Sequence, residues 1–234
     1  MSTNANRVRA ASTKSGKRSS AKLAVETVSR KPLQGRSKAS LERMLGAARE
    51  LMLESGSEDF TLIEVSRRGN VSIGSIYLRF ESKENLVRAV IASTLEDIAR
   101  DESEMLARVR DDSRSLSDFV PRYVESFAEV LKTHAPLLRL SMQRASYDPL
   151  VSGPGKLSAI ASATAGAGAM LEFADEFGGK DRAMKATSAY HIIFATLARE
   201  LSLGSTRESA QNQDWELLKR ELGKMCLAYL KMDA

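Results

Sequence analysis

Hydroxyl, aromatic and basic side chains gather between residues 61 and 83, where their types and spacing suit contact with duplex DNA. The set consists of Thr61, Ser72, Ile73, Gly74, Ser75, Tyr77, Arg79 and Lys83. The small residues from Ser72 to Ser75 permit a close approach, and a helix beginning there would direct free amides and the positive end of its dipole at a phosphate. The tyrosine, arginine and lysine side chains add donors to phosphate oxygens or base edges. The cluster therefore predicts a DNA-binding surface.

Two short helices are needed to position this cluster, and the sequence carries the signals that begin and end them. Thr61 and Glu64 have the spacing of a capping box, in which each side chain accepts the backbone amide of the other residue. Gly69-Asn70 suits a left-handed turn, and Ser72 can cap a second helix that ends near Phe80. In a helix-turn-helix, the second helix enters the major groove, about 12 Å wide, and the first crosses the DNA backbone. The pattern alone also fits core helices of a different small domain.

The remainder of the chain predicts more helices. From residue 39 onward the apolar residues recur at helical spacing, without a useful run of strand-like alternation. We therefore expect an all-α fold of about nine helices. Their expected ranges are 38–55, 61–68, 72–80, 82–100, 119–131, 136–146, 156–176, 180–203 and 213–232. Breaks are expected at Pro136, at Asp148-Pro149 and at 152–155, and Pro121 is expected to be tolerated only near the first turn of its helix.

Charge and periodicity divide the chain into three expected parts. These are a basic arm at residues 1–37, a DNA-binding domain at 38–84 with its helix-turn-helix at 61–80, and a helical domain at 85–234. Residues 1–38 hold ten Lys or Arg and one acid, so this stretch carries +9 although the whole chain carries +5. Such a composition cannot bury a core, which favours a disordered tail. Contact of the arm with DNA phosphates or the minor groove is the alternative.

The last two expected helices, 180–203 and 213–232, are apolar on more than one face. A helix of that kind must be covered twice. One face can pack on its own domain and the other on a second copy of the chain, which would form a four-helix bundle at a two-fold axis. We therefore expect a homodimer.

Several other classes are disfavoured. No apolar run approaches the ~20 residues of a membrane span, the N-terminus lacks the apolar segment of a secretory signal, and a single cysteine, Cys226, precludes an internal disulfide. We expect a cytoplasmic protein without a membrane partner. His134 and His191 have no Cys or paired carboxylates at ligand spacing, so no metal site is expected. No cofactor motif or catalytic constellation stands out, so we expect neither a cofactor nor an enzyme.

Residues 43–91 closely resemble the N-terminal domain of the tetracycline-repressor (TetR) family of bacterial regulators. The resemblance rests on the spacing of the following residues: Ala47, Ala48, Gly56, Thr61, Val65, Val71, Ser72, Gly74, Tyr77, Phe80, Lys83 and Leu86. It implies that Tyr77 and Lys83 bind phosphate, that Thr61 contacts the DNA backbone, and that 72, 73 and 75 face the groove, with Phe80 in the core. Three positions depart from the family pattern, namely Ser66, Gly69 and Asn70. The family usually has alanine, alanine and glycine at these positions, in that order.

The resemblance also implies a function for the C-terminal half, which in the family binds a small molecule and dimerises through its last two long helices. It favours a repressor that a small apolar effector releases from a palindromic operator, with two recognition helices about 34 Å apart or a multiple of that spacing. Candidate pocket residues are Phe119, Tyr123, Phe127, Met142, Met170, Phe173 and Phe194, with His134, Gln143 and His191 as polar partners. Ordinary core packing is the alternative for each.

Two rival functions remain open at this point. A helical enzyme would need catalytic groups that the sequence does not reveal. A non-specific basic DNA-packaging protein would use the arm as its chief binding element and would leave no footprint of fixed position. Activation of transcription, rather than repression, also stays open.

Overall fold

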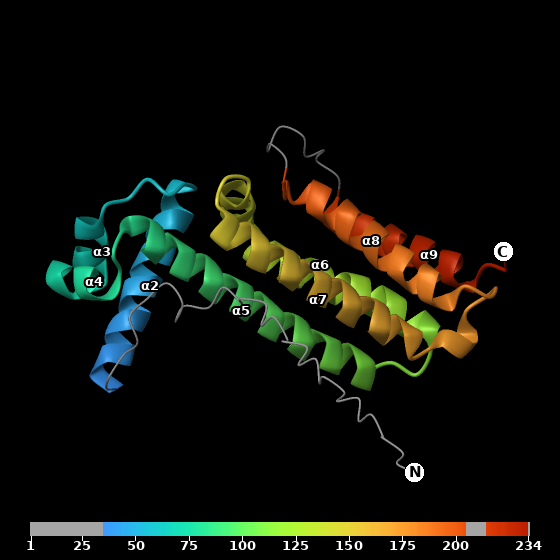
Figure 1. Ribbon diagram of the computed structural model, residues 1–234. Coiled ribbons are helices and arrows are strands. Elements are labelled where there is room, and N and C mark those ends of the chain that lie inside the picture. The colour runs from blue at the N-terminus through green and yellow to red at the C-terminus, as the bar shows by residue number, and fades with distance from the viewer. Residues whose placement is uncertain (1–34, 205–213, 234) are drawn as a thin grey trace, which may run out of the picture.

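The computed structural model describes residues 35–204 and 214–233 (Figure 1). This part of the chain forms eight α-helices and one short 3-10 helix without a strand, which confirms the all-α expectation. The helices are α2 (Gly35–Ser55), α3 (Leu62–Arg68), α4 (Ile73–Arg79), α5 (Lys83–Asp111), α6 (Leu116–Ala145), α7 (Pro149–Leu171), α8 (Arg182–Glu200) and α9 (Trp215–Lys231), with the 3-10 helix η1 at Ala174–Glu176. The expected arm at 1–37 lies outside the described residues, except for the backbone of 35–37 in α2.

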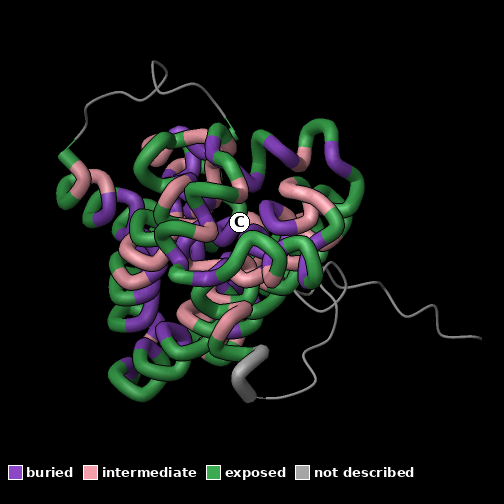
Figure 2. Tube along the Cα trace, turned by 90° about the vertical axis from the view of Figure 1, so that its left-hand side faces the viewer, coloured by how far each residue is buried: buried purple, intermediate pink, exposed green. Residues whose placement is uncertain are grey.

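Helices α2, α3 and α4 form the head of the molecule, which lies at one end of the long helix α5 (Figure 1). One apolar core joins the head to the first turns of α5, and it includes Met52, Val65, Ile76, Phe80 and Leu86. Each of these side chains is fully buried. Figure 2 shows that buried and exposed positions alternate along the helices. The head is therefore held by side chains that meet from four helices.

Helix α5 is longer than the sequence predicts, because it continues past residue 100 to Asp111. The expected end of this helix at residue 100 is therefore wrong. Met105, Leu106 and Val109 are buried on one face of the helix, while the charged residues of this stretch occupy the others. The many charged residues of this stretch made its narrow apolar stripe hard to recognise in the sequence. This stripe is enough to hold α5 against α6 and α7.

Two expected breaks at prolines are also wrong. Pro136 lies inside α6 and Pro154 lies inside α7, and Pro121 is in the second turn of α6 rather than its first. A proline in a helix interior costs about 3 kcal/mol. In α6 that cost is offset by apolar burial on both sides of Pro136. Asp148 caps α7 with Pro149 in its first turn, which is a favourable place for proline, so α7 begins at 149 and ends at 171 instead of spanning 156–176.

Helices α6 to α9 form the body of the molecule. Helix α6 packs against α5, α7 and α9, while α8 packs against α7 and α9. The centre of the body is a ladder of rings, with centroids 5.7 Å apart for Phe119 and Tyr123 and 5.4 Å apart for Tyr123 and Phe127. The two last helices begin and end close to the expected bounds.

A buried ionic network ties the head to the body, and no sequence pattern predicted it. Asp148 lies at the start of α7. Its Oδ2 accepts hydrogen bonds from Arg88 Nε of α5 at 2.8 Å and from Arg144 Nε of α6 at 2.9 Å. Arg144 also donates to Glu58, in the segment between α2 and α3. Burial opposes ionisation of Asp148, but hydrogen bonds from the two arginines outweigh it and hold its pKa below the usual range.

We predict that Arg144→Ala lowers the free energy of unfolding by about 3 kcal/mol, because it leaves Asp148 buried with one cation fewer. Urea unfolding followed by circular dichroism measures this change. Arg100→Ala is the control, since Arg100 pairs with Asp97 at the surface and its removal should change stability little. Equal effects of the two substitutions would contradict the role given to the network.

The network also makes a pH prediction. Because the pKa of Asp148 is lowered on folding, its contribution to stability is complete above the ordinary carboxyl range and is lost as the pH falls through the lower folded-state pKa. Wild-type protein should therefore lose more stability than Arg144→Ala on acidification. Parallel losses in urea titrations at neutral and acidic pH would argue against this assignment.

Candidate nucleic-acid interface and ligand groove

The pair α3 and α4 is fixed by the capping interactions that the sequence predicts. Thr61 N donates to Glu64 Oε2 at 2.7 Å and Glu64 N donates to Thr61 Oγ1 at 3.2 Å, which completes the capping box. Ser72 Oγ accepts the amide of Ser75 at 3.1 Å and caps α4. The left-handed residue of the turn is Asn70, with a φ of 47°, whereas Gly69 is in the right-handed helical region. The predicted turn is confirmed at one of its two residues.

Gly69 is needed for packing rather than for a positive φ. A Cβ at this position would lie 2.9 Å from the carbonyl oxygen of Arg43 and 3.3 Å from Cβ of Ala47, so it would clash with α2. Ser66 adds a further tie, because its hydroxyl donates to the carbonyl of Val71 at 2.6 Å. Two of the residues that depart from the family pattern thus fix how α3 meets its neighbours.

Helix α4 has one buried and one exposed face. Ile76 and Phe80 are fully buried, whereas Ile73, Tyr77 and Leu78 expose 38%, 58% and 70% of their surface. Ser72 and Gly74 are also exposed at the start of the helix, and Ser75 is half-buried, with its hydroxyl 2.7 Å from that of Ser72. Helix α4 lies at the far end of the head (Figure 1). A free helical face of this kind can enter a DNA groove.

Three of the predicted phosphate contacts are placed differently from one another. Tyr77 projects from the free face of α4, and Lys83 at the start of α5 lies with Nζ 4.8 Å from the centroid of the Phe60 ring. That ring restricts the ammonium group to the head surface. Thr61 is exposed, but its hydroxyl already donates to Glu64 Oε2 at 2.9 Å. A phosphate contact through this hydroxyl would therefore have to displace the Glu64 bond.

Arg79 does not lie on the free face, contrary to the sequence expectation. Its side chain is only 9% exposed and has interactions within the protein. The free face instead carries Leu78, which is the most exposed apolar residue of α4 and was not among the residues predicted from the sequence. The spacing of Ile73, Tyr77 and Leu78 at one side of a helix could have identified it. The free face is thus less basic and more apolar than predicted.

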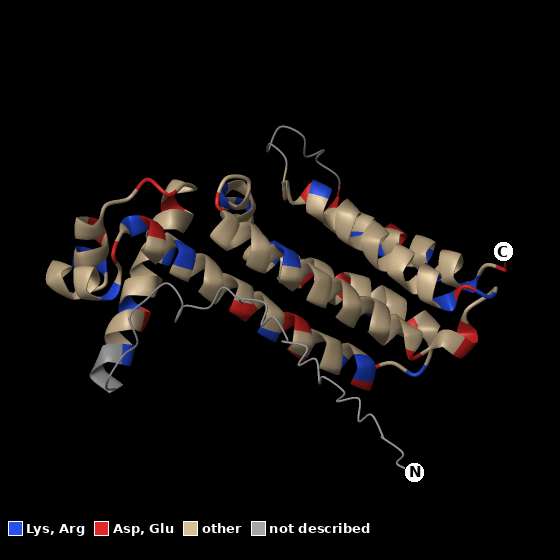
Figure 3. Cartoon of the chain, in the orientation of Figure 1, with Lys and Arg blue, Asp and Glu red and all other residues tan. Residues whose placement is uncertain are grey.

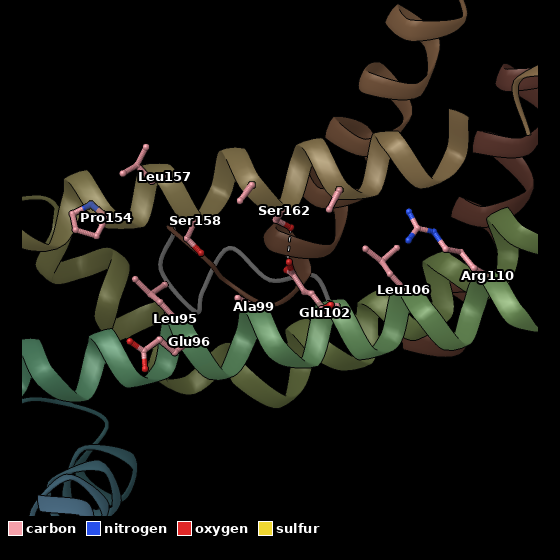
Figure 4. Close-up of a pocket in the computed structure, with 13 residues that line it drawn as sticks. Leu95, Glu96, Ala99, Glu102, Leu106, Arg110, Pro154, Leu157, Ser158 and Ser162 are labelled. Carbon is pink, nitrogen blue, oxygen red and sulfur yellow. Dashed lines mark hydrogen bonds between the residues drawn. The ribbon is translucent and has the colours of Figure 1, made fainter. Parts of the chain in front are cut away.

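A groove of about 620 Å³ lies between α5 and α7 (Figure 4). Its floor and walls include Leu95, Ala99, Leu106 and Leu157, and Glu102 and Ser162 face each other across it. A smaller cavity of about 340 Å³ adjoins it toward α6 and α8, and the two share Leu95, Glu102, Ser158 and Ser162. We call the two together the α5/α7 groove.

Most of the predicted pocket residues do not line this groove. Only Met142 and Phe194 reach its smaller part. The other five, Phe119, Tyr123, Phe127, Met170 and Phe173, belong to the packed core of the body. Among the suggested polar partners, His134 pairs with Asp101 at 2.8 Å, His191 is exposed, and Gln143 lines a separate cavity near the head. Sequence spacing identified apolar residues but could not separate core from cavity wall.

A chain of polar groups crosses the groove instead. Ser162 Oγ donates to Glu102 Oε1 at 3.0 Å and lies 2.8 Å from the hydroxyl of Tyr190. Burial raises the pKa of Glu102 despite the Ser162 hydrogen bond, and burial also raises the pKa of Tyr190 to about 12. These residues escaped the sequence analysis, because no motif marks a single glutamate on an amphipathic helix.

One cluster of carboxylates in the described residues has the spacing of a metal site, namely Glu125, Glu129 and Glu216. A buried ammonium group already occupies the space between them. Lys219 Nζ lies 2.6, 2.7 and 2.9 Å from oxygens of these three residues. Burial alone would lower the pKa of Lys219, but the three hydrogen bonds raise it. This cluster therefore serves to fasten α9 to α6.

Helices α8 and α9 leave large apolar side chains uncovered. Their most exposed members are Met184, Ile192, Leu217 and Met225, at 66%, 47%, 46% and 64%. Both helices lie together along one edge of the body (Figure 1). The two-faced pattern seen in the sequence thus corresponds to a covered face and an open face. None of the helices in the described segments is long and apolar enough to cross a membrane.

Comparison with known proteins agrees with this architecture. Residues 44–90 match the model of the family of bacterial regulatory proteins named tetR. A structure from Mesorhizobium loti assigned to the TetR family shares 16% identity over 84% of this chain and 98% of its own, with a TM-score of 0.68. A transcriptional regulator from Aquifex aeolicus shares 20% identity over 80% and 96%, with a TM-score of 0.56.

A third solved structure is the fatty acid degradation regulator FadR from Bacillus halodurans, with 13% identity over 84% of this chain and 97% of that one and a TM-score of 0.58. Curated protein sequences gave no significant match. The chain therefore carries the N-terminal domain of the tetR family of bacterial regulatory proteins on residues 44–90 and has the fold of TetR-family transcriptional regulators.

Proposed function

We propose that this protein is a dimeric transcriptional repressor that binds a palindromic operator through α4 and is released from it by a small molecule. The free face of α4 carries the proposal. Its opposite face is anchored in the head core by Ile76 and Phe80, so a rigid support presents Ile73, Tyr77 and Leu78 outward. Helix α3 would then lie across the DNA backbone. The proposed division is a DNA-binding domain at 38–84 and a ligand-binding and dimerisation domain at 85–234.

The exposed groups of α4 and α5 suit distinct kinds of DNA contact. The small exposed residues Ser72 and Gly74 would allow the helix to approach the groove floor, while the phenol of Tyr77 and the ammonium of Lys83 would donate to phosphates. Apolar side chains such as Ile73 and Leu78 can contact thymine methyl groups. Phosphate contacts would give affinity for any sequence, and base contacts would give preference for one site.

A second copy of the chain would cover the open face of α8 and α9. Burial of the four exposed apolar side chains named above would remove apolar surface from water. Each Å² of apolar surface buried in this way stabilises the association by about 25 cal/mol. Two such helix pairs facing each other form a four-helix bundle. The resulting two-fold axis would set the two α4 helices at a fixed separation, which a palindromic operator would match.

The link between the groove and the head supports control by a ligand. Ala145 and Val151 line the groove. Ala145 directly follows Arg144, which binds Glu58, and Val151 lies three residues after Asp148, which binds Arg88. Val151 also belongs to the head core. A ligand that spreads the α6–α7 junction would therefore shift the head. Such coupling requires that the ligand prefers the spacing of the DNA-free protein.

We predict that Tyr77→Phe and Lys83→Ala each weaken binding to specific and unrelated duplexes and reduce the slope of affinity against salt concentration by about one phosphate contact. The operator would first be selected from random duplexes, and fluorescence anisotropy across a salt series would measure both quantities. Tyr147→Phe and Lys180→Ala make the same changes at exposed positions of the body and should leave binding unaltered.

Selection that yields no preferred sequence and no footprint of fixed position would sink the repressor proposal. That result would favour a DNA-packaging protein instead. Binding that Tyr77→Phe and Lys83→Ala leave unaltered would show that α4 and the start of α5 do not face DNA.

A charge in the proposed dimer face should separate the subunits. We expect Met225→Glu to sediment as a monomer at micromolar concentration and to bind the operator at least about tenfold more weakly, since an isolated head gains nothing from the second half-site. Leu150→Glu places the same charge at an exposed apolar site on α7 and should remain dimeric. A monomeric wild-type protein, or a dimeric Met225→Glu variant of native helicity, would refute this face as the interface.

A further inference from the structure

The α5/α7 groove has mostly apolar walls, and two basic residues line it, Arg110 and Lys156. Helix α7 contains one charged residue, Lys156, and appears almost uniformly uncharged in Figure 3. Its groove-facing residues are mostly alanine, serine and leucine. A volume of about 620 Å³ falls within the range of pockets that hold drug-sized molecules. The shape and lining therefore suit a molecule with a long or broad apolar part.

Negative charge is concentrated where the two parts of the groove meet. Glu102 is half-buried there, and its hydrogen-bonding partner in the described residues is the neutral hydroxyl of Ser162 at 3.0 Å. Glu96 adds a second carboxylate nearer the head end (Figure 4). Burial, with a smaller contribution from the charge of Glu102, raises the pKa of both Tyr123 and Tyr190, so these neighbours are uncharged at neutral pH.

The nearby cations do not neutralise Glu102. Arg110 lines the far end of the groove, but its guanidinium is paired with Glu172 at 2.6 Å. Lys156 lines the smaller part of the groove, but it is exposed and precedes Ser162 by six residues on α7, a rise of about 9 Å along the helix axis. A carboxylate in an apolar groove without an ion partner is costly to keep ionised. Consistent with this, burial raises the pKa of Glu102.

We propose that the α5/α7 groove binds an amphiphilic organic cation, with the cationic head against Glu102 and the apolar part along Leu95, Leu106 and Leu157. The bound cation supplies the missing counter-charge. Ser162, held between Glu102 and Tyr190, keeps the carboxylate oriented toward the open groove. This inference rests on the proposed function, because it names the class of molecule that acts on the repressor, and it extends that function by assigning Glu102 as the residue that selects charge.

The test compares three ligands with the same ten-carbon chain and different heads, namely decyltrimethylammonium, decanol and decanoate. Isothermal titration calorimetry with the full-length protein, without DNA and below micelle-forming concentrations, gives each dissociation constant. Decyltrimethylammonium should bind most tightly and decanoate most weakly. Decanoate binding as tightly as the cation, or tighter, would overturn the proposal, as would failure of the cation to bind.

Glu102→Gln removes the charge and retains a hydrogen-bonding group of the same size. It should weaken binding of decyltrimethylammonium at least about tenfold, as expected for loss of an interaction with a buried charge, and should leave decanol affinity nearly unchanged. Glu104→Gln is the matched control, because Glu104 lies on the exposed side of α5 outside the groove and should bind all three ligands as the wild type does. Equal affinity of Glu102→Gln and wild type for the cation would overturn the proposal.

Thermal unfolding of Glu102→Gln should occur at the same temperature as that of the wild type or higher, since the substitution removes a carboxylate that burial disfavours. Should the variant unfold early, the wild-type ranking of the three heads still decides the proposal. Addition of decyltrimethylammonium should also release wild-type protein from a selected operator. Failure to find any operator would count against the proposed function, whereas the DNA-free titrations judge the ligand class alone.

Discussion

The burial of one side of α4 is the constraint on which the rest of the molecule depends. Ile76 and Phe80 are fully enclosed by side chains of α2, α3 and α5, so the opposite side of α4 must face outward. Gly69 and Ser66 set the approach of α2, α3 and the turn, and the caps at Thr61 and Ser72 fix where each helix begins. A seven-residue helix has little stability of its own, and only this packing gives it a defined direction.

Local chemistry made the head predictable from sequence. Capping residues act through the nearest amides, so Thr61 with Glu64, and Ser72 with Ser75, could be assigned from spacing alone. The long helices of the body were less predictable because their boundaries depend on tertiary contacts. Pro136 and Pro154 carry a local penalty that the packing of α6 and α7 exceeds, and the buried Met105 and Val109 extend α5 through a segment rich in charge.

Contacts between side chains from distant segments could not be predicted from the sequence. Arg79 is of a residue type that commonly contacts DNA, but its side chain is buried in the head, while the neighbouring Leu78 is exposed to solvent. Glu102 and Ser162 are 60 positions apart and meet only because α7 returns along α5. The same return brings Asp148 to Arg88, which places a buried ionic link between the groove and the head. In the proposed repressor, this link would convert occupancy of the groove into movement of α4.

The claim that α4 occupies the major groove can be tested most directly by methylation interference on a selected operator, because methyl groups on guanine N7 project into that groove. If α4 lies in the major groove, we expect two clusters of interfering guanines on one face of the duplex, separated by one helical turn of about 34 Å or a multiple of it. Interference that is absent, or that comes only from methyl groups in the minor groove, would contradict it.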